Sequence, residues 1–308
     1  MRIWFFGTSA FAVPSLERLV AEQFTVDCCI TQPDRPQGRG QRLEPSPVKQ
    51  AAVRLKVPLL QPERLSSAAL EGRSADLGIV AAYGQLIKPD VLTRPRLGMI
   101  GVHPSLLPKY RGAAPINWAL LKGEQVTGMS IFRLVERLDA GEILLQESVP
   151  VLPADDAETL GQRLALLGAE CVVRAVRLLE SGRVRATAQD DAQSTYAPKL
   201  TKAQGRIDWQ AAAEDISALV RATVPWPGAW TVWRGEGLKI WRALVSEDEA
   251  PAAAPGTVVR ASQDGIAVRT GRGILLVQEL QAAGKRRMAA QEFLAGRQMS
   301  VGERLGED

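Results

Sequence analysis

The chain has 308 residues, 46% of them hydrophobic and 23% charged, and a formal net charge of +4. These values are typical of a soluble globular protein with one large domain or two, and the mild positive charge permits a polyanionic partner without requiring one. No apolar run approaches 18 residues, which argues against a membrane span. The three cysteines, Cys28, Cys29 and Cys171, form neither a disulfide framework nor a spaced metal set, so we expect a cytoplasmic protein without a metal.

Short apolar runs alternate with amphipathic stretches through the first 150 residues and predict alternating strands and helices. Strands are expected at residues 2–6, 25–31, 57–62, 75–83 and 99–103, and helices at 14–23 and 46–56. This order favours a Rossmann-like α/β fold with a doubly wound parallel sheet. The turn after the first strand, FFGTSAFA, has one glycine where a dinucleotide fingerprint has three, which argues against a nicotinamide cofactor.

The composition and hydrophobic patterning of the sequence change after about residue 186. A polar, weakly patterned stretch at 187–205 is interpreted as a linker. Short strands separated by turns follow, and they predict a small OB-like β-barrel domain over 206–308. The expected strands are 229–233, 238–245, 256–261, 265–270 and 273–281. The predicted domains are therefore 1–186 and 206–308, joined by the linker.

The only histidine of the chain, His103, ends the strand at 99–103. Ligands of a parallel sheet lie at the carboxyl ends of its strands, so His103 is a candidate site residue. Asp139 lies farther along, in the turn-like stretch RLDAGEIL. A nearby carboxylate raises the pKa of an imidazole and orients it. A cationic imidazole can then stabilise an oxyanion while the carboxylate accepts a proton, which suits attack of an amine on a carbonyl.

Several motifs together carry a family resemblance that covers nearly the whole chain. VHPSLLPKYRGAAPINWAL and TGMSIFRLVERLDAGEIL resemble the signature of the formyltransferases, which use 10-formyltetrahydrofolate. Within that superfamily the chain is most similar to the methionyl-tRNA formyltransferase family. TQPDRPQGRGQRLEPSPVK, ADLGIVAAYGQLIKP, TYAPKLTKAQGRIDW and VPWPGAW resemble further segments of that family in the same order. The resemblance implies formyl transfer to the amino group of initiator methionyl-tRNA, for translation initiation.

The resemblance also implies a catalytic trio of an asparagine, a histidine two residues later and an aspartate. His103 and Asp139 match their motif positions, whereas Gly101 stands where the family has the asparagine. The side chains at 101 and 103 of a strand point to the same side. Glycine has no side-chain amide to donate to the oxyanion; its backbone or a water could donate with poorer preorganisation, and loss of one such donor costs about 10²–10³ in rate. We expect the Gly101→Asn substitution to restore activity if the backbone at residue 101 tolerates a side chain.

Two groups of binding residues follow from the same resemblance. The folate cosubstrate is expected at Leu86, Ile87, Ser105, Leu106, Leu107 and Pro108. The tRNA is expected at Arg35, Gly38, Arg39, Gly40, Arg42, Lys199, Lys202, Arg206, Lys285, Arg286 and Arg287. From residue 206 onward 13 Lys and Arg balance 13 Asp and Glu, so a basic tRNA-binding face in this half would have to be local.

Other functions fit parts of the sequence. A glycinamide ribonucleotide or sugar-nucleotide formyltransferase, or a folate hydrolase domain, would share the signature, but the Arg- and Gly-rich loop and the second half favour tRNA. Without the asparagine, the chain could instead bind folate and tRNA without catalysis. The protein is expected to be a monomer with no membrane association.

Overall fold

The computed structural model describes residues 1–37 and 42–307, and for Gln37 and Arg42 only the backbone. The chain forms two compact units. The first contains residues 1–115, 126–150 and 161–197, and the second contains residues 116–125, 151–160 and the chain from Pro198 onward. Within the described residues, no helix is both long enough and apolar enough to span a bilayer.

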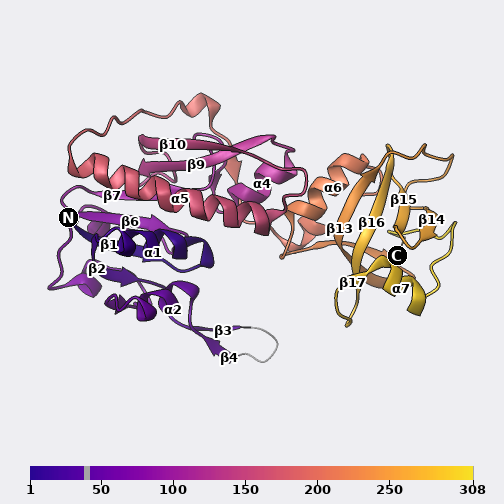
Figure 1. Cartoon of the computed structure of the whole chain (residues 1–308), viewed down its shortest axis with the longest axis horizontal. Coiled ribbons are helices and arrows are strands. Elements are labelled where there is room, and N and C mark those ends of the chain that lie inside the picture. The colour runs from indigo at the N-terminus through magenta and orange to yellow at the C-terminus, as the bar shows by residue number, and fades with distance from the viewer. Residues whose placement is uncertain (38–41, 308) are drawn as a thin grey trace. The chain divides into compact units, whose positions relative to one another are not determined.

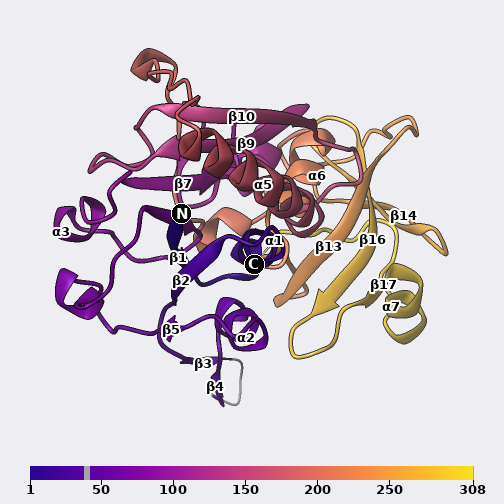
Figure 2. The same cartoon turned by 60° about the vertical axis from the view of Figure 1, so that its left-hand side comes forward.

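A seven-stranded sheet forms the centre of the first unit, with the strand order β10-β9-β7-β6-β1-β2-β5 (Figures 1 and 2). The five strands from β7 to β5 pair in parallel, and β9 and β10 extend the sheet in antiparallel fashion. The strands are β1 (Arg2–Gly7), β2 (Thr25–Ile30), β5 (Leu59–Leu60), β6 (Leu77–Ala81), β7 (Met99–His103), β9 (Val126–Arg133) and β10 (Ile143–Pro150). The predicted α/β class is confirmed, and the two antiparallel strands were not among the predicted elements.

Helices flank this sheet, and the longest of them, α5, runs along β7 and β9 (Figures 1 and 2). The helices that begin in this unit are α1 (Val13–Ala21), α2 (Pro47–Arg54), α3 (Pro89–Leu92) and α4 (Pro115–Leu121), and α5 (Ala157–Glu180) ends in it. A Cβ on Gly168 of α5 would lie 3.1 Å from Met129 Cε and 3.3 Å from Val102 Cγ1, so this glycine lets the helix approach closely. Val102 therefore faces α5, and its neighbours Gly101 and His103 face the opposite side of the sheet.

The second unit is built on an antiparallel sheet of six strands with the order β12-β13-β16-β15-β14, in which β17 also pairs with β16. The strands are β12 (Ala229–Trp233), β13 (Glu236–Ser246), β14 (Val258–Ser262), β15 (Gly265–Arg269), β16 (Ile274–Ala282) and β17 (Met288–Ala289). Its core includes Trp209, Trp233, Leu280 and Phe293, and helices α6 (Ala213–Ala222) and α7 (Ala290–Gly296) pack on the sheet. The small β domain predicted for this half is confirmed.

Two short strand pairs complete the first unit. Strands β3 (Arg35–Gln37) and β4 (Arg42–Glu44) pair in antiparallel fashion, and β8 (Arg111–Gly112) pairs in parallel with β11 (Tyr196–Ala197). The second pair joins part of the predicted linker to the first unit. The remaining short elements are the 3₁₀ helices η1 (Ala10–Ala12), η2 (Ser67–Leu70), η3 (Asp191–Gln193) and η4 (Lys202–Gly205). The domain boundaries at 186 and 206 stay a prediction.

Candidate active site

His103 is the last residue of β7, as the sequence predicted, and the residue is only 6% exposed. Its Nε2–H donates to the carbonyl oxygen of Tyr110 at 2.8 Å. This contact fixes the tautomer, because a carbonyl oxygen can only accept a hydrogen bond. In the neutral ring, the other nitrogen, Nδ1, therefore carries the lone pair.

The group that faces Nδ1 is the carboxylate of Asp139, with Oδ2 at 3.6 Å. The two residues predicted from the sequence thus lie together. The backbone N–H of Gly112 donates to the same Oδ2 at 2.8 Å, which holds the carboxylate in place. Asp139 itself has a positive φ of 48°, a left-handed conformation that aspartate tolerates better than most residues.

Burial lowers the pKa of His103, against the opposing effects of the Asp139 carboxylate and the Tyr110 carbonyl. The Asp139 carboxylate raises the pKa of His103, as the sequence predicted, but burial lowers the pKa by more, so the net shift is downward. Desolvation disfavours the charged ring more strongly than one carboxylate at 3.6 Å favours it. The resting His103 is a neutral base, and a proton that reaches Nδ1 would form an ion pair with Asp139.

Gly101 lies opposite Phe132 in the antiparallel pairing of β7 with β9. A Cβ on Gly101 would come within 2.4 Å of Phe132 Cε1 and 2.7 Å of its Cζ. The φ of Gly101 is not in the left-handed region, so the backbone would accept a side chain, but the Phe132 ring occupies the space. The same ring makes an edge-to-face contact with His103, with centroids 6.2 Å apart. Gly101 and Phe132 therefore pack directly against each other, a contact that the sequence did not predict.

The loop after β7 is held by polar side chains of β9 and β10. The Ser130 hydroxyl donates to the Ser105 carbonyl at 2.6 Å and accepts from the Leu107 N–H at 3.0 Å. Gln146 Nε2 donates to the Leu107 carbonyl at 2.8 Å and to Ser130 Oγ at 2.9 Å. Ser130 and Gln146 were also missed; Ser130 is a buried polar residue of β9, and Gln146 is an exposed residue of β10. They fix the backbone of Ser105–Pro108.

The other residues predicted at the folate site lie in the loop after β6. Leu86 is 79% exposed, and Ile87 packs partly against the buried cluster that contains Trp4 and Tyr83. Strands β6 and β7 are parallel neighbours, so the loops that follow them leave the same edge of the sheet. This arrangement brings the loop of Leu86 and Ile87 to the same edge as Ser105–Pro108.

The comparisons with known proteins give the family. The model of the family "Formyl transferase" matches residues 1–176, and that of "Formyl transferase, C-terminal domain" matches residues 199–298. A methionyl-tRNA formyltransferase of Pelotomaculum thermopropionicum is 46% identical over 100% of this chain and 99% of its own length. That of Syntrophus aciditrophicus is 44% identical over 99% and 98%. The chain belongs to the methionyl-tRNA formyltransferase family. The predicted family and enzyme class are confirmed.

Solved structures similar to this family member agree on the fold. The sugar 3N-formyl transferase WlaRD, solved in the presence of dTDP and 5-N-formyl-THF, has a TM-score of 0.70 at 17% identity and covers 93% of this chain and 99% of its own. Glycinamide ribonucleotide transformylase 1 from Symbiobacterium toebii has a TM-score of 0.51 at 25% identity, covering 62% of this chain and 94% of its own. In the described part of the chain, no group of three or more His, Cys, Asp or Glu could hold a metal ion.

The residues predicted to contact tRNA fall into three groups in this family member. Gly38, Arg39 and Gly40 lie outside the described residues. Arg35 is exposed in β3, and Arg42 belongs to β4. The others are exposed residues of the second unit: Lys199, Lys202, Arg206, Lys285, Arg286 and Arg287. Arg286 pairs with Glu292 and Arg287 with Glu279, so carboxylates partly neutralise the predicted basic run.

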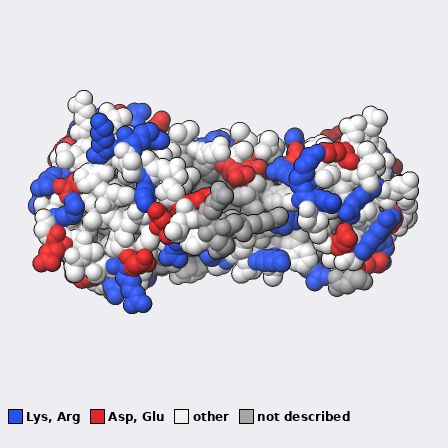
Figure 3. Space-filling model, turned by 90° about the horizontal axis from the view of Figure 1, so that it is seen from below, with Lys and Arg blue, Asp and Glu red and all other residues white. Residues whose placement is uncertain are grey.

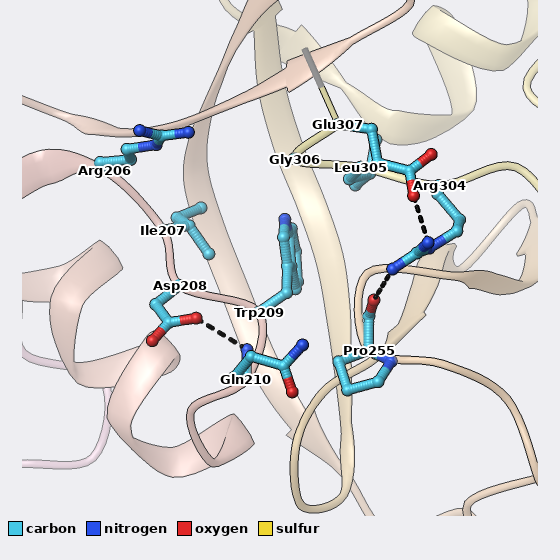
Figure 4. A pocket seen from close by; sticks show the side chains of 10 residues that line it. All are labelled: Arg206, Ile207, Asp208, Trp209, Gln210, Pro255, Arg304, Leu305, Gly306 and Glu307. Carbon is cyan, nitrogen blue, oxygen red and sulfur yellow. Dashed lines mark hydrogen bonds and ion pairs between the residues drawn. The ribbon is translucent and has the colours of Figure 1, made fainter.

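The second unit contains a pocket of about 370 Å³ (Figure 4). Of the residues predicted to bind folate or tRNA, one, Arg206, lines this pocket. Its lining includes Trp209, Asp208 and Glu307, and Arg304 bridges Glu307 and the Pro255 carbonyl across it. The residues that line the pocket thus bind one another. The pocket therefore gives no support to a catalytic role.

The buried histidine makes the stability of the protein depend on pH. Below pH 6.5, the ordinary value for histidine, the unfolded chain takes up a proton at residue 103 that the folded chain resists. We therefore expect the free energy of unfolding to fall as the pH drops from about 7.5 to 5.5. In NMR, the single imidazole should titrate below pH 6.5. A His103→Gln variant should lose this part of the pH dependence, and an imidazole pKa above 6.5 would contradict the assignment.

The contact of Gly101 with Phe132 changes the expected result of restoring an asparagine. Gly101→Asn alone should overpack the site, lower the stability by about 1–3 kcal/mol and give little gain in rate. Gly101→Asn combined with Phe132→Leu should recover stability and raise the transfer rate toward about 10²-fold. Phe132→Leu alone is the control and should give no gain. Additive effects in this double-mutant cycle would show that the two positions do not share one space.

Proposed function

We propose that this protein transfers the formyl group of 10-formyltetrahydrofolate to the amino group of methionyl-tRNA, the initiator species, with His103 and Asp139 as the proton-transfer pair. The observation that carries the proposal is their geometry. The only histidine of the chain is buried at the end of a central strand, with a carboxylate 3.6 Å from its free nitrogen. The names of the full-length relatives support the same reaction.

The chemistry follows from the neutral state of the ring. The methionyl amine attacks the formyl carbon, and the carbonyl oxygen becomes negative. His103 Nδ1 takes a proton from the attacking nitrogen, and Asp139 stabilises the imidazolium that forms. The proton then passes to N10 of the folate as the bond from N10 to the formyl carbon breaks. The products are formylmethionyl-tRNA and tetrahydrofolate, and the pair returns to its resting state.

Ser105, Leu106, Leu107 and Pro108 are proposed to bind the folate, together with the backbone at Leu86 and Ile87. A binding loop that is rigid before the ligand arrives loses less entropy on binding. The hydrogen bonds from Ser130 and Gln146 to the Ser105 and Leu107 backbone supply that rigidity. They hold the loop that follows His103 directly in the chain.

A second function has support from one observation. Residue 101 is a glycine, so the site has no side chain at the position of the family asparagine. Phe132 fills the space that such a side chain would need. A protein that binds folate and tRNA without catalysis would fit that packing. A formylation assay run beside a tRNA-binding titration separates the two, because binding without turnover would favour the second function.

A cluster of tryptophans and cations supports the proposed tRNA contact of the second unit. On β13, Lys239 Nζ lies 5.2 Å from the centroid of the Trp241 ring, and Arg287 Cζ lies 5.6 Å from the same centroid. Trp230 is the cross-strand partner of Lys239, and Arg206 Cζ lies 5.8 Å from its ring. Figure 3 shows Lys and Arg side chains gathered on one face of this unit (right), with Asp and Glu among them. Aromatic faces beside cations suit nucleotide bases and phosphates.

Arg35, Gly38, Arg39, Gly40 and Arg42 are proposed to contact the tRNA from the first unit. Arginine forms bidentate contacts with phosphate and stacks on exposed bases. We also propose that the protein is a cytoplasmic monomer. The three cysteines support this location, since all are buried and free of disulfides.

Removal of either member of the proposed proton-transfer pair should nearly abolish transfer. His103→Ala should lower kcat by about 10²–10⁴-fold because the proton acceptor is lost. Asp139→Asn should be nearly as damaging, since an amide cannot stabilise the imidazolium. Initial rates of formyl transfer to methionyl-tRNA measure both effects. Rates within twofold of the parent protein, in variants that fold, would refute the roles.

Replacement of Arg287 tests the proposed tRNA surface. Arg287→Gln should weaken tRNA binding and reduce the slope of log affinity against log salt by about 1, because one phosphate contact is lost. Arg272→Gln is the matched control: Arg272 is an exposed arginine of the same unit, paired with Glu214 and outside the tryptophan cluster. Equal effects of the two substitutions would mean that the cluster has no special part in tRNA binding.

A further inference from the structure

Residues 189–197 lie against the candidate active site, although the sequence predicted them as linker. The N–H of Arg111 donates to the Thr195 carbonyl at 2.8 Å, and the N–H of Tyr110 donates to the Thr195 hydroxyl at 2.8 Å. Strand β11 then pairs with β8. This segment therefore supports Tyr110–Gly112, whose backbone contacts both His103 and Asp139.

Gln189 connects this segment to the loop that carries Asp139. Its Nε2 donates to the carbonyl oxygen of Asp139 at 2.8 Å and to that of Gly141 at 2.7 Å. Its Oε1 accepts from Arg111 Nε at 3.1 Å and from Arg111 Nη2 at 2.7 Å. The amide thus uses both donors and both lone pairs, and its neighbours allow only this orientation.

Arg111 needs these contacts because its side chain is only 2% exposed. A buried guanidinium is stable only if hydrogen bonds and a counter-charge replace its water. Gln189 supplies two of the hydrogen bonds, and Asp191 supplies the charge, with Oδ1 at 2.8 Å from Nη2. The charged group is therefore a fixed anchor for the glutamine.

The loop at Asp139 needs an anchor of this kind. The φ of 48° at Asp139 is unfavourable for a residue with a side chain, so surrounding contacts must maintain it. On one side the loop is pressed against β9, where a Cβ on Gly141 would overlap the Arg133 carbonyl. On the other side Gln189 binds the carbonyls of Asp139 and Gly141. Together these contacts define where the carboxylate points.

We propose that Gln189 is a positioning residue for formyl transfer: anchored by Arg111, it holds the Asp139 loop so that the carboxylate faces His103. Gln189 does not touch the reacting atoms and acts through Asp139. The proposal rests on the proposed function, in which Asp139 stabilises the imidazolium of His103. It assigns part of the catalytic geometry to the segment between the two predicted domains.

The test uses Gln189→Met in the full-length protein, with Gln193→Met as the matched control. Gln193 is an exposed glutamine of the same segment whose amide donates to Asp190. Methionine has a similar length but cannot donate to the loop carbonyls. We expect Gln189→Met to lower kcat by roughly 10–100-fold, the effect of a small displacement of a catalytic group. The KM values for 10-formyltetrahydrofolate and methionyl-tRNA should stay within twofold, and the control should match the parent protein.

A second readout reports on the pair itself. His103 is the only histidine, so its imidazole signals are assigned without ambiguity in an NMR titration. The Asp139 carboxylate raises the pKa of this ring, so the pKa in Gln189→Met should fall below that of the parent protein. The control should leave it unchanged. This readout needs no turnover, so it remains decisive even if the parent protein proves inactive and the proposed function fails.

The outcomes separate positioning from a general loss of structure. A folded Gln189→Met variant with the kcat and the His103 pKa of the parent protein would overturn the proposal. A lower kcat with an unchanged pKa would also overturn it, because Asp139 would not have moved. If Gln189→Met does not fold, Gln189→Glu replaces it. Glutamate still accepts from Arg111 but cannot donate to the loop, so its kcat should fall with unchanged KM values, and parental kcat would overturn the proposal.

Discussion

The geometry of the site depends on three backbone positions, Tyr110 to Gly112. The Tyr110 carbonyl accepts from His103, and the Gly112 N–H donates to Asp139, so one short segment orients both members of the pair. The two side chains are 3.6 Å apart at their nearest atoms, too far for a hydrogen bond between them. Their alignment is therefore imposed by the backbone, which is itself held by pairing with β11.

Burial has opposite effects on the two stages of the proposed reaction. In the resting protein it lowers the pKa of His103 and keeps the ring neutral, as a base must be. Once a proton is on Nδ1, the same low-dielectric surroundings strengthen its attraction to Asp139. In the proposed reaction, exclusion of water would thus both keep the base neutral and stabilise its charged form.

The pairing of Gly101 with Phe132 is a packing arrangement that bears on the proposed reaction. An aromatic ring packed over a glycine fills the gap that the missing side chain would leave between β7 and β9. That ring also contacts His103 edge-on and so restricts its orientation. The strand pair gains a dense contact, but residue 101 has no side-chain amide that could donate to the oxyanion of the proposed reaction. The effect of a substitution at residue 101 therefore depends on the side chain at residue 132.

Local patterns in the sequence predicted the parallel strands of the first unit, the α/β class, the family and the candidate pair of His103 and Asp139, because these depend on short-range periodicity and motif spacing; strands β9 and β10 were not predicted. They could not reveal Phe132 beside Gly101, since this contact needs the register of β9 against β7. Nor could they reveal Gln189, whose segment looks like a polar linker until it folds back beside Arg111. The lowered pKa of His103 was missed for the same reason. Burial, register and contacts between distant segments are properties of the packed chain, so only the tertiary structure decided them.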